Sequence, residues 1–346
     1  MFATIAGHDD LLTRLARLPS DRLPALLASA AISFLVRRDR PQPLAAYFPE
    51  PRRPQPPFGA GFESAVRAFI SGRLDDVLTE CGRHRYQMNE VGRCTQIALG
   101  LAAVAGSGQE PVALADLGTG AGLGLQLDRY RYQVGDAAPA GPPGMTLHCQ
   151  ARGEARPPAV RLPPIADRAG IEVAPVDLRD AAARAWLLAC APPEASALTR
   201  LAGAIEVTRA NPAEIIAGDV VGELPGVLGQ VPGPHPVVVT DAYLAVFLPP
   251  ERRADLIAIL EQAGRTRPVT WLSLDPLVPL GPSGRDSVQE LALPAPLIGD
   301  YQRKGVFAVL GARTFDRGDD QQRLLARAHP SGQWIEWLDG AHPAGP

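Results

Sequence analysis

The sequence has few of the residues that build metal-held or cross-linked folds. Its four cysteines stand far apart with no CxxC pair, and its six histidines form no HxxxH or mixed Cys/His array. This spacing argues against structural zinc sites and disulfide frameworks, so no metal site is expected. Lysine is almost absent, with Lys304 alone among 34 basic residues. Such an arginine bias is typical of a GC-rich genome and indicates no function.

Long hydrophobic runs and an excess of one charge are also missing. No apolar stretch approaches the roughly 20 residues of a membrane helix, and no basic-then-apolar leader opens the chain. The net charge of −3, from 34 basic and 37 acidic residues, gives no electrostatic reason to expect nucleic-acid binding. We therefore expect a cytoplasmic protein without a membrane or nucleic-acid partner. A homodimer is left open.

What the 346 residues do contain is enough apolar sequence, 46%, for a sizeable core. Residues 1–108 place apolar positions at helical spacing and are predicted to form a helical N-terminal cap region. Prolines divide its first part into short helices, and a proline-rich connector covers 41–61. Helices are then expected at 62–81 and 84–105.

A different pattern begins near residue 109, where apolar strands alternate with helical segments. This alternation predicts an α/β domain over 109–346 with a mostly parallel, doubly wound sheet. A Pro/Gly-rich stretch at about 136–165, with one strand-like piece, is expected to be an insertion. Segments 287–293 and 305–314, with little between them that could form a helix, are predicted to be an antiparallel edge pair.

A glycine-rich turn follows the first predicted strand. Asp116 stands at the strand end, and Gly118, Thr119, Gly120 and Gly122 form a GxGxG run that fits a dinucleotide site poorly. A helix ending near Tyr132 is expected next. The D-x-G-x-G-x-G form resembles the first motif of class I S-adenosylmethionine-dependent methyltransferases. The resemblance implies a Rossmann-like fold in which Asp116 and the turn hold the methionine end of the cofactor. A turn that only packs helix on strand is the alternative.

Later strand ends fit the same resemblance. Glu172, in Gly-Ile-Glu-Val-Ala-Pro, corresponds to the acid that accepts both ribose hydroxyls, with Asp177 as its rival. Asp219 and Val220 correspond to the segment that contacts adenine, although Asp219 could simply cap the next helix. Two further residues, Asp241 and Tyr243, fall on the segment beneath the transferable methyl and are predicted to contact substrate. The resemblance also places Asp241 in the cofactor pocket.

A narrower resemblance is to a bacterial family known as domain of unknown function 2332. It spans roughly residues 60–338 and is carried by Arg-Tyr-Gln-Met-Asn-Glu-Val-Gly-Arg-Cys at 85–94 and by Ala-His-Pro-Ser-Gly-Gln-Trp-Ile-Glu-Trp at 328–337, among other segments. The family turn usually reads GxSAGLNL and its tail HPHG, so this chain departs at both. The lost tail histidine weakens any two-histidine site.

Three polar residues of the first segment have two interpretations. Asn89, Glu90 and Arg93 could reach cofactor or substrate, or Arg93 could pair with Glu90 at helical i,i+3 spacing. His329 in the tail could be a general base or a packed histidine.

The sequence thus favours methyl transfer from S-adenosylmethionine to an oxygen or nitrogen of a small molecule. Asp241, His329 or Glu90 could remove the acceptor proton, with Tyr243 at the same junction. Two other hypotheses stay open: a non-methylating reaction of the same cofactor, such as a cyclisation, and a catalytically silent binding module.

Overall fold

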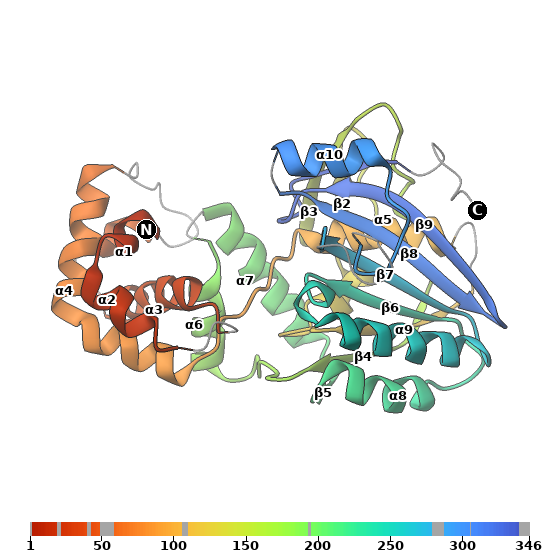
Figure 1. The fold of residues 1–346 in the computed structure, drawn as a ribbon, viewed down its shortest axis with the longest axis horizontal. Coiled ribbons are helices and arrows are strands. Elements are labelled where there is room, and N and C mark those ends of the chain that lie inside the picture. The colour runs from red at the N-terminus through yellow and green to blue at the C-terminus, as the bar shows by residue number, and fades with distance from the viewer. Residues whose placement is uncertain are drawn as a thin grey trace. The chain divides into compact units, whose positions relative to one another are not determined.

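The computed structural model describes residues 2–18, 22–39, 43–48, 59–105, 110–192, 195–278, 287–304 and 306–338. The chain forms two compact units (Figure 1). Unit 1 comprises residues 1–90 and 176–205, and unit 2 comprises 91–175 and 206–346. These limits differ from the expected boundary at 108, because helix α5 (Arg93–Ala105) packs on the strands of unit 2.

Unit 2 is an α/β structure built on one large mixed sheet, as expected. Its order is β2-β3-β10-β9-β8-β7-β6-β1-β4-β5, and most neighbouring strands run parallel. In the described part of the chain the strands are β1 (Val112–Leu117), β2 (Arg131–Val134), β3 (Thr146–Arg152), β4 (Ile165–Glu172), β5 (Glu214–Ala217), β6 (Val237–Ala242), β7 (Val269–Pro276), β8 (Ala308–Asp316), β9 (Asp319–Ala328) and β10 (Trp334–Trp337).

The strand order reverses between β1 and β6. From β1 the chain adds β4 and β5 on one side, then returns to add β6 and β7 on the other. The antiparallel strands follow β7, because β8 pairs with β7 and β9 with β8. The predicted insertion supplies β3, which with β2 extends the sheet beyond β10.

The antiparallel pair is formed by β8 and β9, whereas the prediction paired residues 287–293 with 305–314. Residues 287–293 form no strand: the Ser287 hydroxyl accepts from the Gln289 amide, a local bond that competes with ladder pairing. A helix, α10 (Ala295–Lys304), follows where none was expected, and prolines at its start are compatible with a helix N-terminus. The partner of β8 is β9, a strand that was not predicted.

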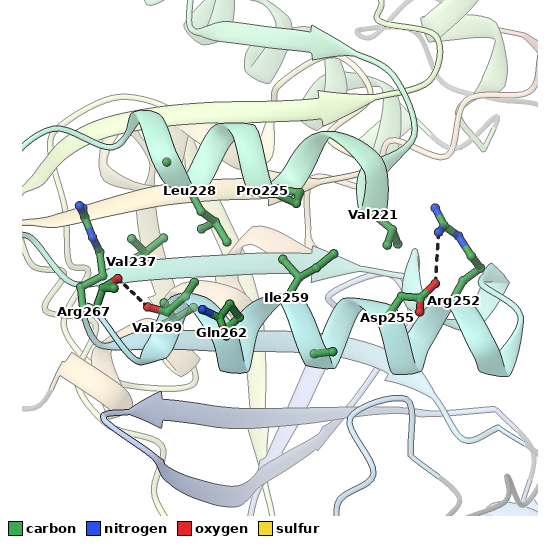
Figure 2. A pocket seen from close by; sticks show the side chains of 14 residues that line it. Val221, Pro225, Leu228, Val237, Arg252, Asp255, Ile259, Gln262, Arg267 and Val269 are labelled. Atoms are coloured by element: carbon green, nitrogen blue, oxygen red, sulfur yellow. Dashed lines mark hydrogen bonds and ion pairs between the residues drawn. The ribbon is translucent and has the colours of Figure 1, made fainter.

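Helices cover both faces of the sheet in unit 2. Side chains alternate between faces along a strand. Leu272 of β7 faces α5, where a Cβ on Gly100 would lie 3.3 Å from it. Trp271 faces the other way, into an apolar cluster with residues of α8 (Val220–Gln230) and α9 (Pro250–Gly264). Figure 2 shows α8 and α9 lying along the strands on this second face.

The prediction of an α-helix after the glycine turn is wrong. A short 3-10 helix, η3 (Gly124–Arg129), leads directly into strand β2. Leu123, Leu125 and Leu127 of this segment are all buried. Arg168 of β4 fixes this path, donating to the Leu125 carbonyl at 2.6 Å and to both oxygens of Asp128 at 2.8 and 2.9 Å.

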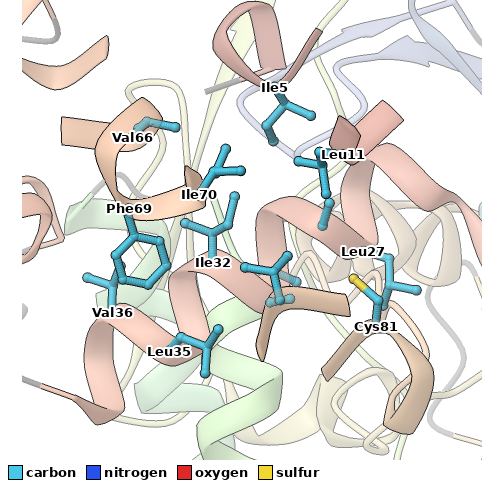
Figure 3. Packing of buried hydrophobic residues seen from close by; sticks show 14 of the residues in the cluster. Ile5, Leu11, Leu27, Ile32, Leu35, Val36, Val66, Phe69, Ile70 and Cys81 are labelled. Atoms are coloured by element: carbon cyan, nitrogen blue, oxygen red, sulfur yellow. The ribbon is translucent and has the colours of Figure 1, made fainter. Parts of the chain in front are cut away.

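Unit 1 is helical, as predicted for the N-terminal region. Its elements are α1 (Phe2–Ala6), α2 (Asp9–Leu15), α3 (Pro24–Arg38), η2 (Pro43–Tyr47), α4 (Ala60–Arg83), α6 (Ala181–Cys190) and the first part of α7 (Ala195–Ala210). Leu27, Ile32 and Ile70, from α3 and α4, are among the fully buried residues of its core (Figure 3). Most of the predicted connector, 49–58, lies outside the described residues.

The segment 84–92 is not helical, contrary to the prediction of a helix over 84–105. Its first residues pack on α6 of unit 1. The Trp186 indole donates to the Arg85 carbonyl at 2.8 Å and stacks on His84 with ring centres 4.1 Å apart. Tyr86 donates its hydroxyl to the Cys190 carbonyl at 3.0 Å. The bond from Trp186 satisfies the Arg85 carbonyl, which a helix would have satisfied internally.

Candidate functional site

The glycine turn is held at the carboxyl end of β1. Gly118, Gly120 and Gly122 have φ of 65°, 57° and 77°, in the left-handed region that glycine adopts without strain. A side chain at Gly118 would also place its Cβ 2.9 Å from Leu244. The amides of Gly118 and Thr119 both donate to the Ile171 carbonyl of β4, which ties the turn to the neighbouring strand.

Asp116 lies beneath this turn on the face of the sheet that α5 covers. Each of its oxygens accepts one hydroxyl, from Thr119 at 2.6 Å and from Thr240 at 2.7 Å. Burial raises the pKa of Asp116 to about 6, although the two hydroxyl bonds favour its charged form. The carboxyl therefore titrates just below neutral pH. Sequence reasoning missed Thr240, which is Asp116's register partner on β6.

Glu172, at the end of β4, reaches the same turn. Its oxygens accept from the Gly120 amide at 3.0 Å and the Ala174 amide at 3.1 Å. Each oxygen has further lone pairs and the side chain is only half-buried, so it can accept additional hydrogen bonds. Its rival Asp177 belongs to unit 1 and is exposed, where hydrogen bonds from Arg179 hold the pKa of Asp177 below its usual range.

Asp219 follows β5 and begins α8. Its carboxylate accepts from the Gly222 amide at 2.9 Å, which is the alternative N-cap role, and also pairs with Arg252 of α9. The side chain remains about half exposed. Val220, the first residue of α8, is buried in the apolar cluster with the sheet, so its side chain has a packing role.

Asp241 lies one residue beyond Thr240 and therefore on the opposite face of the sheet. It is fully buried, with oxygens accepting from the Trp271 indole at 2.7 Å and the Ala245 amide at 3.3 Å. Asp275, on β7, shares a hydrogen bond with it. Burial, and then repulsion by Asp241, raises the pKa of Asp275 well above that of an ordinary carboxyl. The shift favours the protonated form of Asp275, which can donate in the hydrogen bond that it shares with Asp241.

Asp275 is a residue that sequence reasoning missed. It stands at the carboxyl end of β7, as Asp116, Glu172 and Asp241 stand at the ends of their strands. A search for acids at the end of one more strand would have found it.

Tyr243 follows β6 in an unusual conformation. Its φ is 66°, a strained value for a residue with a side chain, and such strain concentrates at functional sites. The Arg93 guanidinium lies over its ring at 4.1 Å. Its hydroxyl is buried without a hydrogen-bond partner among the described residues. Burial also raises the pKa of this phenol, so it stays protonated and can donate.

The two segments that carry the narrower resemblance meet beside Tyr243. Arg93 donates to the carbonyls of Pro330 at 2.7 Å and Ala242 at 3.2 Å. Gln96 donates to the His329 carbonyl at 3.0 Å. A Cβ on Gly332 would lie 2.1 Å from the Gly92 carbonyl carbon, so these backbones approach as only glycines permit. The start of α5 and the tail thus support the end of β6.

His329 has a defined role for one ring nitrogen. Its Nδ1 accepts from the Ser331 amide at 3.1 Å, which leaves the proton of a neutral ring on Nε2. In this arrangement His329 is a hydrogen-bond donor at Nε2 and has no basic nitrogen to offer there.

Asn89 and Glu90 belong to unit 1. Glu90 is paired there with Arg200 of α7 at 3.3 Å. Glu90 lies outside α5, which begins at Arg93, so the two residues do not share a helix.

No group of three or more His, Cys, Asp or Glu side chains is placed to hold a metal ion in the described part of the chain. None of the helices in those residues is long and apolar enough to cross a membrane.

Comparison with protein families matches residues 1–337 to the family described as "Uncharacterized protein conserved in bacteria (DUF2332)". The chain belongs to this family. A comparison with curated proteins finds no match. Membership in DUF2332 covers nearly the whole chain, including both units and the segments at 85–94 and 328–337.

Proposed function

We propose that unit 2 binds S-adenosylmethionine at the carboxyl ends of β1, β4 and β5 and transfers its methyl group to an oxygen or nitrogen of a small molecule. The observation that carries this proposal is the position of the glycine turn. It lies where the strand order reverses, the place where open α/β sheets bind their ligands, and a half-buried carboxylate flanks it.

The donor and acceptor set suits a cationic nucleoside. Glu172 keeps lone pairs for two vicinal hydroxyls, and Asp219 offers an acceptor for an exocyclic amine. Asp116 adds negative charge near the methionine end. Val173 and Phe247, 65% and 58% exposed, supply apolar surface after β4 and in η4 (Ala245–Phe247), suited to a purine face.

One feature departs from a typical nucleotide site. No α-helix follows the turn, so helix-dipole stabilisation of the cofactor carboxylate is absent there. The Gly118, Thr119 and Gly120 amides are already bonded to Ile171 and Glu172. Recognition would therefore depend on the side-chain carboxylates more than on turn amides.

The bound cofactor would supply an electrophilic methyl group, and the chain's residues would orient the acceptor. Tyr243 would donate its hydroxyl to the acceptor molecule, with Arg93 fixing the ring. His329 would donate from Nε2. Asp241 would act indirectly: it is buried, and it holds the loop that begins η4 through the Ala245 amide. None of these groups is a free base, which favours acceptors that lose their proton to water.

Equilibrium binding of S-adenosylmethionine, S-adenosylhomocysteine and NAD tests the proposal by calorimetry. We expect micromolar dissociation constants for the two sulfur nucleosides and no binding of NAD. Glu172→Gln should weaken nucleoside binding at least about tenfold, since each charged hydrogen bond is worth about 1.5–3 kcal/mol. Asp177→Asn, the matched control at the rival position, should leave it unchanged.

Failure of both nucleosides to bind would overturn the proposal and leave the silent-module hypothesis. Binding without release of S-adenosylhomocysteine during turnover would instead favour non-methylating chemistry of the same cofactor.

The binding should also depend on pH. Asp116 is anionic above its pKa of about 6 and neutral below it. We therefore expect S-adenosylhomocysteine affinity to fall as the pH drops from 7 to 5. An affinity that stays constant over this range would contradict a charge role for Asp116.

A further inference from the structure

A groove of about 660 Å³ runs between α8 and α9 of unit 2. Val237 and Val269, the first residues of β6 and β7, form its floor at one end. The glycine turn lies at the opposite ends of these strands. At its other end the groove reaches Arg252, which pairs with Asp219 of the proposed nucleoside site. The end at Arg267 lies at the start of β7 and is therefore apart from the candidate site.

Aliphatic side chains line much of the groove, and its polar lining residues are Arg252, Asp255, Gln262, Thr266 and Arg267. Figure 2 shows Val221, Pro225 and Leu228 on α8 and Ile259 on α9 lining the same space. No aromatic side chain is among its lining residues, so it offers no ring for stacking. Such a surface favours a flexible aliphatic chain over a planar ligand.

Small residues keep the groove open. Gly229 lines it, and a Cβ built there would meet nothing within 4 Å. Glycine lowers the stability of a helix interior, and Gly229 makes no close packing contact that would require a glycine. Along α9 the lining residues extend from Arg252 to Ala263, about 16 Å at the helical rise, which a medium- to long-chain acyl group matches.

The two ends of the groove differ in charge. Arg252 is neutralised by ion pairs to Asp219 and Asp255. Arg267, at the other end, donates only to the Val231 carbonyl at 3.2 Å and has no acidic partner among the described residues. One end therefore presents an uncompensated guanidinium, which pairs well with a carboxylate.

We propose that this groove binds a linear aliphatic carboxylate, with its chain between α8 and α9 and its carboxylate at Arg267. Apolar walls bury the chain, and the unpaired guanidinium sets the direction in which it lies.

Calorimetric titration of the full chain with dodecanoate, below its micelle concentration, tests this proposal. Dodecanol serves as the ligand without charge and acetate as the ligand without chain. We expect micromolar, saturable binding of dodecanoate and none of acetate. Arg267→Gln should weaken dodecanoate at least about tenfold and leave dodecanol unchanged.

Gly229→Leu fills the groove and should weaken both long-chain ligands at least about tenfold. Gly226→Leu is its matched control, because Gly226 also lies in α8 with open space at its Cβ but does not line the groove. This control should bind as the wild type does, and melting curves of both variants verify folding.

Three results would overturn the proposal. The first is no saturable dodecanoate binding by the wild-type chain. The second is an equal loss of dodecanoate affinity in Gly229→Leu and Gly226→Leu, as expected if dodecanoate binds outside the groove. The third is a concentration-dependent dimer in sedimentation that Gly229→Leu disrupts while dodecanoate fails to bind, which would assign the groove to a second copy.

Discussion

Asp116 and Asp241 stand at the ends of adjacent parallel strands, yet their surroundings differ in kind. Asp116 receives two hydroxyl groups on the α5 face, whereas Asp241 receives two N–H groups and shares a hydrogen bond with Asp275 on the α8/α9 face. Register explains the separation, since Asp116 pairs with Thr240 and Asp241 is the next residue.

These surroundings decide which acid can respond to a ligand. Threonine hydroxyls can rotate to donate or accept, so Asp116 can change charge without losing its partners. The N–H groups around Asp241 can only donate, so Asp241 must keep an acceptor toward each of them. Asp116 is therefore the acid suited to recognition, and the pair is suited to holding η4.

The largest effect should come from breaking the buried pair. Asp241→Asn would turn an amide N–H₂ toward the donors of Trp271 or Ala245 and leave a buried donor unsatisfied. With the charge also lost, we expect about 3–5 kcal/mol less stability in urea unfolding.

Asp275→Asn is the matched control for this experiment. Asn keeps a donor toward Asp241 and an acceptor for the Val246 amide, so the loss should stay below about 1 kcal/mol. Equal losses in the two variants would mean that the shared proton is assigned to the wrong residue.

The next largest effect is a pH-dependent gain in stability when Asp116 is replaced by Asn. The folded-state pKa of about 6 lies above the usual 3.8, so ionisation of Asp116 destabilises the folded protein increasingly from pH 4 to 6. Asp116→Asn lacks this penalty. Its stability relative to wild type should rise by up to about 3 kcal/mol between pH 4 and 7.

Urea unfolding at several pH values measures this difference. A difference between the two proteins that is constant with pH would contradict the raised pKa of Asp116.

The smallest expected effects come from removing one hydroxyl donor at each acid: Thr240 at Asp116 and Ser273 at Asp275. Thr240→Val removes a bond that favours the charged Asp116, so the pKa should rise further, by about one unit, with about 1.5 kcal/mol lost at pH 8. Ser273→Ala removes a bond to neutral Asp275 and should cost about 1 kcal/mol without moving the pH profile. Carboxyl carbon chemical shifts of Asp116 would report the pKa directly, and an unchanged value in Thr240→Val would contradict its role.

The alternation of strands and helices was sufficient to predict the α/β class and the mostly parallel sheet. It failed where individual side-chain hydrogen bonds decide the backbone path. The 3-10 turn after Gly122 depends on Arg168, more than 40 residues away, and the turn at Ser287 depends on a side-chain to backbone bond. Strand β9 was missed because its polar first half lacks an apolar pattern.

The sequence predicted where the candidate residues stand on their strands better than it predicted their contacts. Strand ends identified Asp116, Glu172 and Asp241, since carboxyl ends of parallel strands share one edge. The face on which each side chain lies depends on register, which the sequence does not state. The strained backbone of Tyr243 likewise has no sequence signal, because no glycine marks it.

The proposed adenosyl nucleoside site at the carboxyl ends of β1, β4 and β5 can be tested by a crystal structure of the protein with S-adenosylhomocysteine. We expect the ribose hydroxyls on Glu172, with the amino-acid part beside the turn above Asp116. A nucleoside seated elsewhere, with Glu172 still bonded only to the Gly120 and Ala174 amides, would contradict this site.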